Sequence, residues 1–179
     1  MIELGVLLIF LGVAAGVGTG VIFLIVGEMR GAPFVATDKR LLESMFAGII
    51  LKPQDTFVDL GSGDGRIVLW AAKKFGCRSV GYEIHPWLVW WSRWKARENK
   101  LKKAEFKRED FWKADISLAD CVFCYLVPRS MERLGLKLER EGKRGMTVIS
   151  RAFEIKRWKD KLILRKEVMG KRVYVYTMP

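Results

Sequence analysis

The sequence VDLGSGDGRIV, residues 58–68, ends an apolar run with three glycines and two aspartates in a single turn. The apolar run predicts a short buried strand over residues 56–60, with Asp59 near its carboxyl end, and the pattern after the turn predicts a helix that begins near Arg66. The glycines of the turn are Gly61, Gly63 and Gly65. In open α/β sheets, ligands bind outside the carboxyl ends of the strands, where bare backbone and a helix N-terminus meet them. We therefore predict that this turn holds a ligand.

Strand-like and helix-like segments alternate on both sides of the turn. The further expected strands are residues 79–84, 104–110, 120–127 and 145–150, and the expected helices are residues 39–50, 66–75, 86–100 and 129–140. Such uniformly apolar strands between helices indicate a parallel sheet that is covered on both faces. Residues 161–168 and 172–178 are two strands around a glycine turn, which predicts a closing antiparallel hairpin. The expected fold is α/β, a Rossmann-like doubly wound and mostly parallel sheet.

The glycine turn does not match the common phosphate-binding motifs. Its pattern is D-x-G-x-G-x-G, because the third glycine comes one residue too early for a dinucleotide fingerprint, and no G-K-[ST] follows it. Asp59 and Asp64 place negative charge where a pyrophosphate would be repelled. The turn therefore favours a ligand with a cationic end.

Two further acidic residues lie at the carboxyl ends of the next two strands. Glu83 lies 22 residues beyond Gly61, at the place where dinucleotide sites use an acid to bind ribose hydroxyls. Asp110 follows the third strand beside Phe111 and Trp112, where a base can be held between rings and its amino group can be bonded. A nucleoside with a positive, amino-acid-like tail satisfies all three positions. We predict S-adenosyl-L-methionine as the cofactor.

These features resemble those of the seven-stranded, class I methyltransferases, and the likeness covers residues 31–179. A closer resemblance rests on four segments in order: APFVATD (32–38), VDLGSGDGRIV (58–68), EIHPWLV (83–89) and YLVP (125–128). With an apolar N-terminal segment, they are similar to the small membrane-associated lysine methyltransferases related to those acting on the adenine nucleotide translocase and the ATP synthase c subunit. This resemblance implies a methyl acceptor that is a lysine of a membrane protein.

The resemblance also implies roles for residues around the cofactor. In YLVP, Tyr125 is our first choice for lining the lysine channel, and Pro128 belongs to the same motif; Tyr125 can equally be a buried strand aromatic. Thr37 can close over the carboxylate of the cofactor, or Thr37 or Asp38 can cap the helix that follows. His85 stands where the family commonly has Asn, and we expect it to edge the adenosine pocket.

The N-terminal segment differs from the rest of the chain. Leu4 to Gly27 contains 24 residues without a charge, which as a helix is about 36 Å long, enough to cross a bilayer core of about 30 Å. A signal peptide is the competing interpretation, but the segment lacks a positive n-region and is too long. Basic residues follow the span and none precedes it, which predicts a cytoplasmic body. We expect a transmembrane anchor over residues 1–30 and a methyltransferase domain over residues 31–179.

Two residue patterns have alternative interpretations. Gly12, Gly16 and Gly20 stand four apart, so they either let a second helix pack closely, giving a homo-oligomer, or are merely tolerated in the span. Four tryptophans recur at helical spacing after Glu83: Trp87, Trp90, Trp91 and Trp94. We expect these indoles to pack on the sheet, and the alternative places some of them at a membrane interface.

Composition limits the remaining classes. The net charge is +12, and residues 1–30 hold one Arg against two Glu, which leaves +13 on residues 31–179. Such a body attracts anionic lipid or nucleic acid, although the N-P-P-Y-type motif of base-amine methyltransferases is absent. Cys121 and Cys124 lie three apart in an expected strand, so they point to opposite faces, and with one His we expect no metal site.

Two further expectations concern the host and a rival class of function. Only one Asn and one Gln occur in the chain, a bias that we interpret as thermophilic. A phospholipid amine is a rival acceptor, and a non-catalytic protein that binds the cofactor and assembles with a partner is the rival class.

Overall fold

The computed structural model describes residues 39–179 together with Gly5, Gly12 and Gly16. The chain divides into two compact units, residues 1–35 and 36–179. Thr37 and the expected membrane span lie outside the described residues, apart from the three glycines, which are helical. Within the part that the structure describes, no helix has the length and the apolar character needed to cross a membrane.

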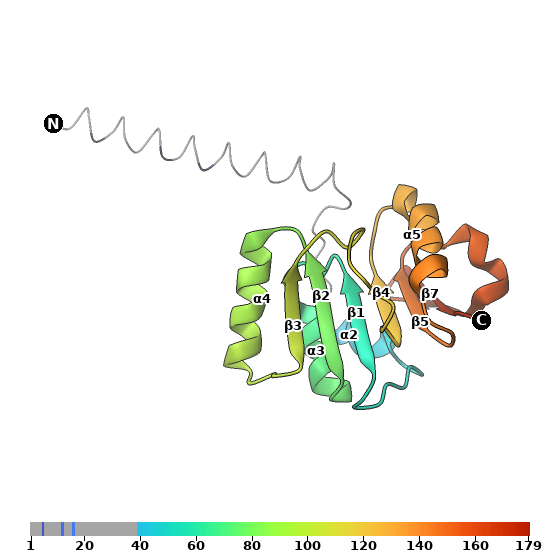
Figure 1. Cartoon of the computed structure of the whole chain (residues 1–179), viewed down its shortest axis with the longest axis horizontal. Helices are drawn as coiled ribbons and strands as arrows, with labels where there is room; N and C mark the ends of the chain where they lie inside the picture. The colour runs from blue at the N-terminus through green and yellow to red at the C-terminus, as the bar shows by residue number, and fades with distance from the viewer. Residues whose placement is uncertain (1–4, 6–11, 13–15, 17–38) are drawn as a thin grey trace. The chain divides into compact units, whose positions relative to one another are not determined.

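The second unit is built on one sheet of seven strands in the order β3-β2-β1-β4-β5-β7-β6 (Figure 1). The strands are β1 (Thr56–Leu60), β2 (Arg78–Glu83), β3 (Ala104–Arg108), β4 (Cys121–Cys124), β5 (Thr147–Arg151), β6 (Leu162–Val168) and β7 (Lys171–Thr177). The first five strands are parallel, and β7 runs antiparallel between β5 and β6. The predicted mostly parallel sheet with a C-terminal antiparallel hairpin is confirmed.

Helices cover both faces of this sheet. They are α2 (Lys39–Met45), α3 (Arg66–Phe75), α4 (Pro86–Glu98), α5 (Pro128–Glu141) and a 3-10 segment, η1 (Lys156–Lys161). One core cluster joins α2 and α3 to the sheet through residues such as Phe57 and Phe123, and the opposite cluster joins α5 and η1 through Val58 and Leu60. A third, smaller cluster packs α4 against α3 and β3. Cys121 and Cys124 belong to different clusters, so the prediction that they point to opposite faces is confirmed.

Element boundaries differ from expectation where the chain turns. β1 and α3 have the predicted bounds, but the helix expected over residues 39–50 ends at Met45, and Gly48 follows with φ +86°. The strand expected over residues 120–127 ends at Cys124, because the chain must leave the sheet to reach Pro128 at the start of α5. This early exit frees Tyr125 from the strand ladder.

The prediction that the tryptophans of α4 pack on the sheet is wrong. The residues that α4 buries are Val89, Ser92 and Ala96. The exposed fractions of Trp87, Trp90, Trp91 and Trp94 are 72%, 56%, 40% and 43%. The helical spacing was correct, but spacing alone does not tell which side faces inward, and here the small residues make the close approach to the sheet.

Candidate functional site

The glycine turn after β1 is held by its neighbour strand. The backbone N–H groups of Gly61 and Ser62 both donate to the carbonyl oxygen of Tyr82 on β2, at 3.0 and 2.9 Å. Gly61, Gly63 and Gly65 have φ values of +83°, +55° and +75°. Residues other than glycine rarely adopt this backbone conformation. At Gly65 space also requires glycine, because a Cβ atom would lie 2.5 Å from the Phe106 ring and 2.6 Å from Ser92 Oγ.

Asp59 is buried beneath this turn without a complete set of partners. Its residue is 2% exposed, and Oδ2 is buried with no hydrogen-bond partner. Burial, with repulsion from Glu83 and Asp64, raises the pKa of the Asp59 carboxyl well above its usual range. A buried polar atom that lacks a partner costs stability, so this oxygen is free to accept a hydrogen bond from a bound ligand.

Glu83 ends β2 and braces the turn. Its Oε2 accepts the N–H of Gly63 at 3.0 Å, and its Oε1 accepts the N–H of His85 at 2.9 Å. A carboxylate offers about four acceptor positions, so both oxygens retain capacity for hydroxyl donors. The 8% exposed side chain therefore both shapes the turn and remains able to bind a diol.

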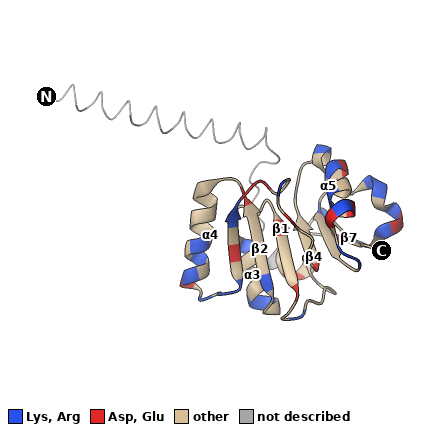
Figure 2. Cartoon of the chain, viewed as in Figure 1, with Lys and Arg blue, Asp and Glu red and all other residues tan. Residues whose placement is uncertain are grey.

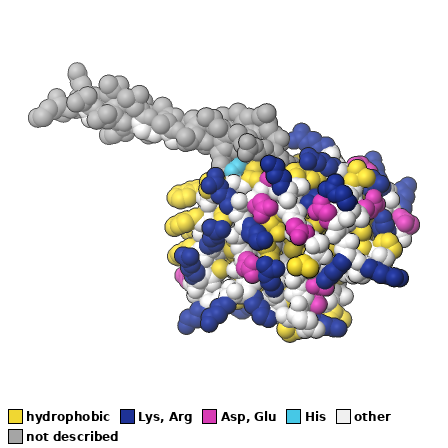
Figure 3. Space-filling model, viewed as in Figure 1, with side chains coloured by type: hydrophobic (Ala, Val, Ile, Leu, Met, Phe, Trp, Pro, Cys, Tyr) yellow, Lys and Arg dark blue, Asp and Glu magenta, His cyan; other side chains and the backbone are white. Residues whose placement is uncertain are grey.

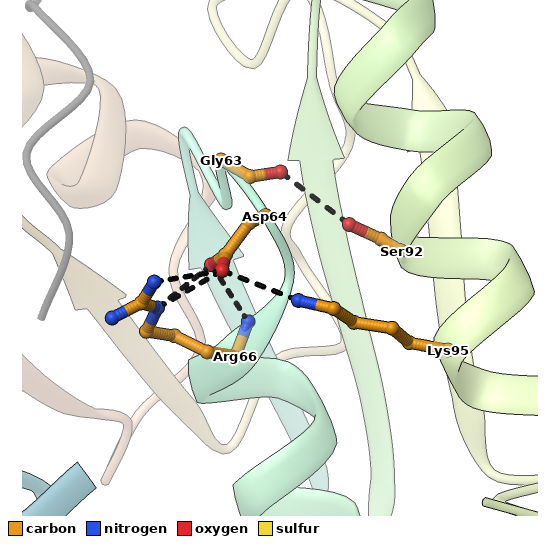
Figure 4. A network of polar contacts seen from close by, with 5 residues as sticks. All are labelled: Gly63, Asp64, Arg66, Ser92 and Lys95. Atoms are coloured by element: carbon orange, nitrogen blue, oxygen red, sulfur yellow. Dashed lines mark hydrogen bonds and ion pairs between the residues drawn. The ribbon is translucent and has the colours of Figure 1, made fainter. Parts of the chain in front are cut away.

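Asp64 points into a network of basic side chains rather than standing alone (Figure 4). Its carboxylate accepts bonds from Arg66 Nε and Nη2 at 2.9 and 2.8 Å, and Lys95 Nζ of α4 lies 3.4 Å away. Partial burial works against ionisation, but the bonds and charges of Arg66 and the charge of Lys95 hold the pKa of Asp64 below its usual range. Its role toward a cofactor stays a prediction, and the structure gives it a fastening role between the turn, α3 and α4.

The adenine-side residues follow β3. Asp110 Oδ1 accepts the N–H of Trp112 at 3.1 Å, which fixes the loop. Phe111 is 7% exposed and belongs to the core. The centres of its ring and of the Trp112 ring are 4.7 Å apart. The other neighbour of Trp112 is Arg133, whose guanidinium is 4.1 Å from the ring centre. The structure thus brings Asp110 and His85 to the same edge as Glu83, with most of the Phe111 ring covered by protein.

The acceptor-side motif lies across the turn, because β1 and β4 are neighbours. A Cβ atom on Gly61 would lie 3.6 Å from Leu126. The Tyr125 hydroxyl accepts a hydrogen bond from Lys171 Nζ at 3.0 Å. The Arg151 guanidinium and the Lys171 ammonium lie 4.8 and 5.4 Å from the centre of the Tyr125 ring. Pro128 is the exposed first residue of α5.

Four residues of this edge were not predicted from sequence. They are Ser62, Ser92, Arg151 and Lys171. Ser62 Oγ is buried without a partner, and Ser92 Oγ donates to the Gly63 carbonyl at 3.4 Å. The charge of Arg151 directly after an apolar strand was the available signal for that residue. Lys171 gave none, because only the antiparallel return of β7 brings it beside Tyr125.

The cysteines lie away from this chemistry. Cys77, Cys121 and Cys124 are buried and free, and burial raises the pKa of the Cys124 thiol to about 12. Among the residues that the structure describes, there is no cluster of His, Cys, Asp and Glu suited to a metal ion.

This sheet, with its strand order reversing between β1 and β4 and acidic residues at the carboxyl ends of β1, β2 and β3, defines the class I methyltransferase type of nucleoside-binding fold. Comparison with known families agrees with this class. The model of the ANTKMT methyltransferase domain matches residues 59–162, and the chain therefore belongs to that family.

Individual relatives carry related names. The chain is 42% identical over 127 residues to the ATP synthase c subunit lysine N-methyltransferase of Homo sapiens, covering 70% of this chain and 54% of that protein. It is 33% identical over 150 residues to a protein-lysine N-methyltransferase of Saccharolobus islandicus, covering 82% and 93%. A solved RNA methyltransferase from Salinibacter ruber, in complex with S-adenosyl-L-homocysteine, is 37% identical with a TM-score of 0.76, covering 81% and 94%. The chain thus spans about half the length of the human relative and nearly all of the other two proteins.

Proposed function

We propose that this chain is an S-adenosyl-L-methionine-dependent protein-lysine N-methyltransferase. The observation that carries the proposal is that Asp59, the glycine turn and Glu83 lie at the same edge of the sheet as Tyr125, because β2 and β4 flank β1. The family of the chain and the names of its Homo sapiens and Saccharolobus islandicus relatives support the same activity.

The residues present fit the cofactor. The buried Oδ2 of Asp59 lacks a donor, and a cationic amino-acid tail supplies one. Glu83 keeps acceptor positions for the two ribose hydroxyls, and we propose that Asp110 binds the adenine amino group. When bound, the cofactor supplies a methyl group made transferable by its sulfonium centre.

The chain itself has to position a lysine and make its amine neutral. Methyl transfer is an in-line displacement, so alignment of donor and acceptor supplies much of the rate. An ammonium ion that enters beside Lys171 and Arg151 meets two positive charges and the Tyr125 ring, and both like charge and desolvation lower the pKa of an amine. We propose that this environment removes the proton to solvent before attack, while the Tyr125 hydroxyl accepts a bond that orients the nitrogen.

We also propose that the substrate is a membrane or membrane-proximal protein and that the chain is a single-pass membrane protein with a cytoplasmic catalytic domain. The support is the 24-residue uncharged segment and the basic residues that follow it. An anchor raises the local concentration of enzyme near such substrates. The row of Gly12, Gly16 and Gly20 supports helix pairing within the membrane as part of the same proposal.

RNA is the second candidate acceptor, and one observation favours it. The similar Salinibacter ruber structure is that of an RNA methyltransferase, and the body of this chain carries +13. Charge alone attracts lipid as well as RNA, so the acceptor has to be decided by experiment.

The test is label transfer from methyl-labelled S-adenosyl-L-methionine to membranes and RNA of the source organism. Fractions of protein, lipid and RNA are separated, and the wild-type chain is compared with Asp59→Ala and Glu83→Ala. The proposal expects label in protein, recovered as methyl-lysine after hydrolysis and lost in both variants while their circular dichroism is retained. Label in RNA or lipid alone would replace the acceptor, and binding without any transfer would favour a non-catalytic partner protein.

A further inference from the structure

The outer face of α4 is an exposed aromatic surface with no role in the site described above. It comprises Trp87, Trp90, Trp91 and Trp94, which are 40% to 72% exposed. Trp87 stacks on Trp90 with ring centres 5.3 Å apart, and the ring centres of Trp91 and Trp94 are 4.9 Å apart. A contiguous exposed apolar patch usually marks an interaction site. We call these four side chains the tryptophan face.

The tryptophan face is directed away from the protein. At about 100° per residue, its four members fall within an arc of about 100° on the helix. The residues that α4 buries, Val89, Ser92 and Ala96, are centred on the opposite side. Figure 3 shows hydrophobic side chains along the edge of the molecule that α4 forms. The helix is thus attached to its domain by small residues and presents its largest side chains outward.

Basic residues border the tryptophan face. A pocket of about 360 Å³ is lined by Trp90 and Trp94 together with Arg93, Arg97 and Arg108. Lys95 Nζ lies 5.0 Å from the Trp91 ring on the other flank. In Figure 2, α4 is uncharged near its start and basic toward its end. The chemistry of the surface is therefore indole next to guanidinium and ammonium.

We propose that the tryptophan face docks on the surface of a bilayer that contains anionic lipids. Tryptophan is enriched at the boundary between acyl chains and headgroups, where its apolar ring and its N–H are both accommodated. A helix with an aromatic face and basic flanks binds such a boundary lying flat. Arg97 and Arg108 bind headgroup phosphates, and the charge of the body adds attraction to an anionic surface.

A bilayer fits this surface better than single-stranded RNA does. Platforms for RNA offer rings on which successive bases stack. Here Trp87 already stacks on Trp90, and the Trp91 and Trp94 rings lie tilted against each other with centres 4.9 Å apart, so the indoles cover ring faces that bases would need. The docked orientation also has a consequence for the site, because α4 begins directly after Glu83 and His85. The cofactor edge is then held next to the membrane surface. Docking itself requires neither cofactor nor methyl transfer.

Tryptophan fluorescence tests the proposal in the full chain. All seven tryptophans fall within residues 70–158, and residues 1–38 contain none. Quenching by brominated lipid therefore reports on the folded body and not on the N-terminal segment. The chain is reconstituted in vesicles of phosphatidylcholine and phosphatidylglycerol at about 7:3, with dibromo-phosphatidylcholine as the quencher. We expect strong quenching, and slowed hydrogen exchange in residues 86–98, compared with vesicles of phosphatidylcholine alone.

Variants separate the contributions. Two double variants each reduce the quenching: Trp87→Ser with Trp90→Ser, and Trp91→Ser with Trp94→Ser. The fourfold variant, which carries all four substitutions, abolishes it. Arg97→Gln and Arg108→Gln each lower the ratio of docked to undocked protein by about fivefold. Trp70→Phe, at a half-buried residue of α3 that packs against the core, is the matched control and leaves the quenching unchanged.

Three results would overturn the proposal. They are absence of quenching in the anionic vesicles, equal quenching in the fourfold variant, and emission that responds to a uridine oligonucleotide but not to brominated lipid. The last result would assign the face to RNA. Because the readout needs no methyl transfer, an inactive protein that docks would still support this inference while removing the proposed enzyme function.

Discussion

Replacing Asp59 by Asn should raise the free energy of unfolding of the free protein and weaken the binding of the cofactor. In the free chain, the Asp59 carboxyl is 2% exposed, and one of its oxygens has no hydrogen-bond partner. Leaving a buried polar group unsatisfied costs about 1–3 kcal/mol, and an amide avoids the charged part of that cost. We expect Asp59→Asn to raise the free energy of unfolding by about 2 kcal/mol, which at this chain length corresponds to a Tm increase of about 4–8 °C.

The pH dependence gives the sign of the effect independently. Because burial raises the pKa of folded Asp59, the folded state holds its proton at pH values where the unfolded state, with a pKa near 4, has lost it. The free energy of unfolding of the wild-type chain therefore falls as pH rises from about 4 through the folded pKa. The advantage of Asp59→Asn should vanish at acid pH and grow toward neutrality.

Calorimetry measures both halves of this prediction. A charge-assisted hydrogen bond contributes about 1.5–3 kcal/mol, so the variant should bind S-adenosyl-L-methionine roughly 10- to 100-fold more weakly. Glu167→Gln, an exposed change on β6, is the charge-matched control and should alter stability by less than about 0.5 kcal/mol. A variant that is destabilised at neutral pH, or that binds the cofactor as well as the wild type, would refute the assignment of Asp59.

Four further predictions concern the rest of the site and the core. In a denaturant titration, Gly65→Ala should lower the free energy of unfolding by about 2–4 kcal/mol, because it adds a clash with Phe106 to an unfavourable φ. The control is Gly76→Ala, at a glycine with a positive φ but open space around it. This change should cost only about 1–2 kcal/mol in the same titration. Equal losses would contradict the close approach at Gly65. Tyr125→Phe should reduce kcat/KM for the acceptor roughly tenfold and leave cofactor affinity unchanged, whereas an effect on the cofactor alone would move Tyr125 out of the acceptor channel. Lys171→Gln removes one positive charge beside that channel and should shift the rising limb of the pH–rate profile to higher pH; an unshifted profile would exclude this role. The buried cysteines, with the pKa of Cys124 raised to about 12, should resist alkylation at pH 8 until the chain unfolds, and rapid labelling of the native protein would show that the strands open.

The sequence predicted best those features that depend on neighbours along the chain. β1 and α3 were placed at their true bounds, because an apolar run and a glycine turn are local signals. Asp59 and Glu83 were expected at one edge of the sheet because parallel strands bring their carboxyl ends together there, and the structure has them there.

Features that depend on distant contacts were missed. The two basic partners of Asp64 come from α3 and α4, and the spacing of acidic residues gave no sign of Lys95. Lys171 reaches Tyr125 only because β7 returns antiparallel beside β5. The tryptophans of α4 had a clear helical period, but the side of the helix that faces the sheet depends on space around Gly65 and Phe106, which no local pattern encodes.

A crystal structure with S-adenosyl-L-homocysteine would test the central claim most directly. We predict that the ligand lies over Gly61 to Gly65, with its amino-acid tail toward Asp59, its ribose hydroxyls on Glu83 and its sulfur facing Tyr125. A ligand bound elsewhere, or bound at this edge without contact to Asp59 and Glu83, would contradict the site described here.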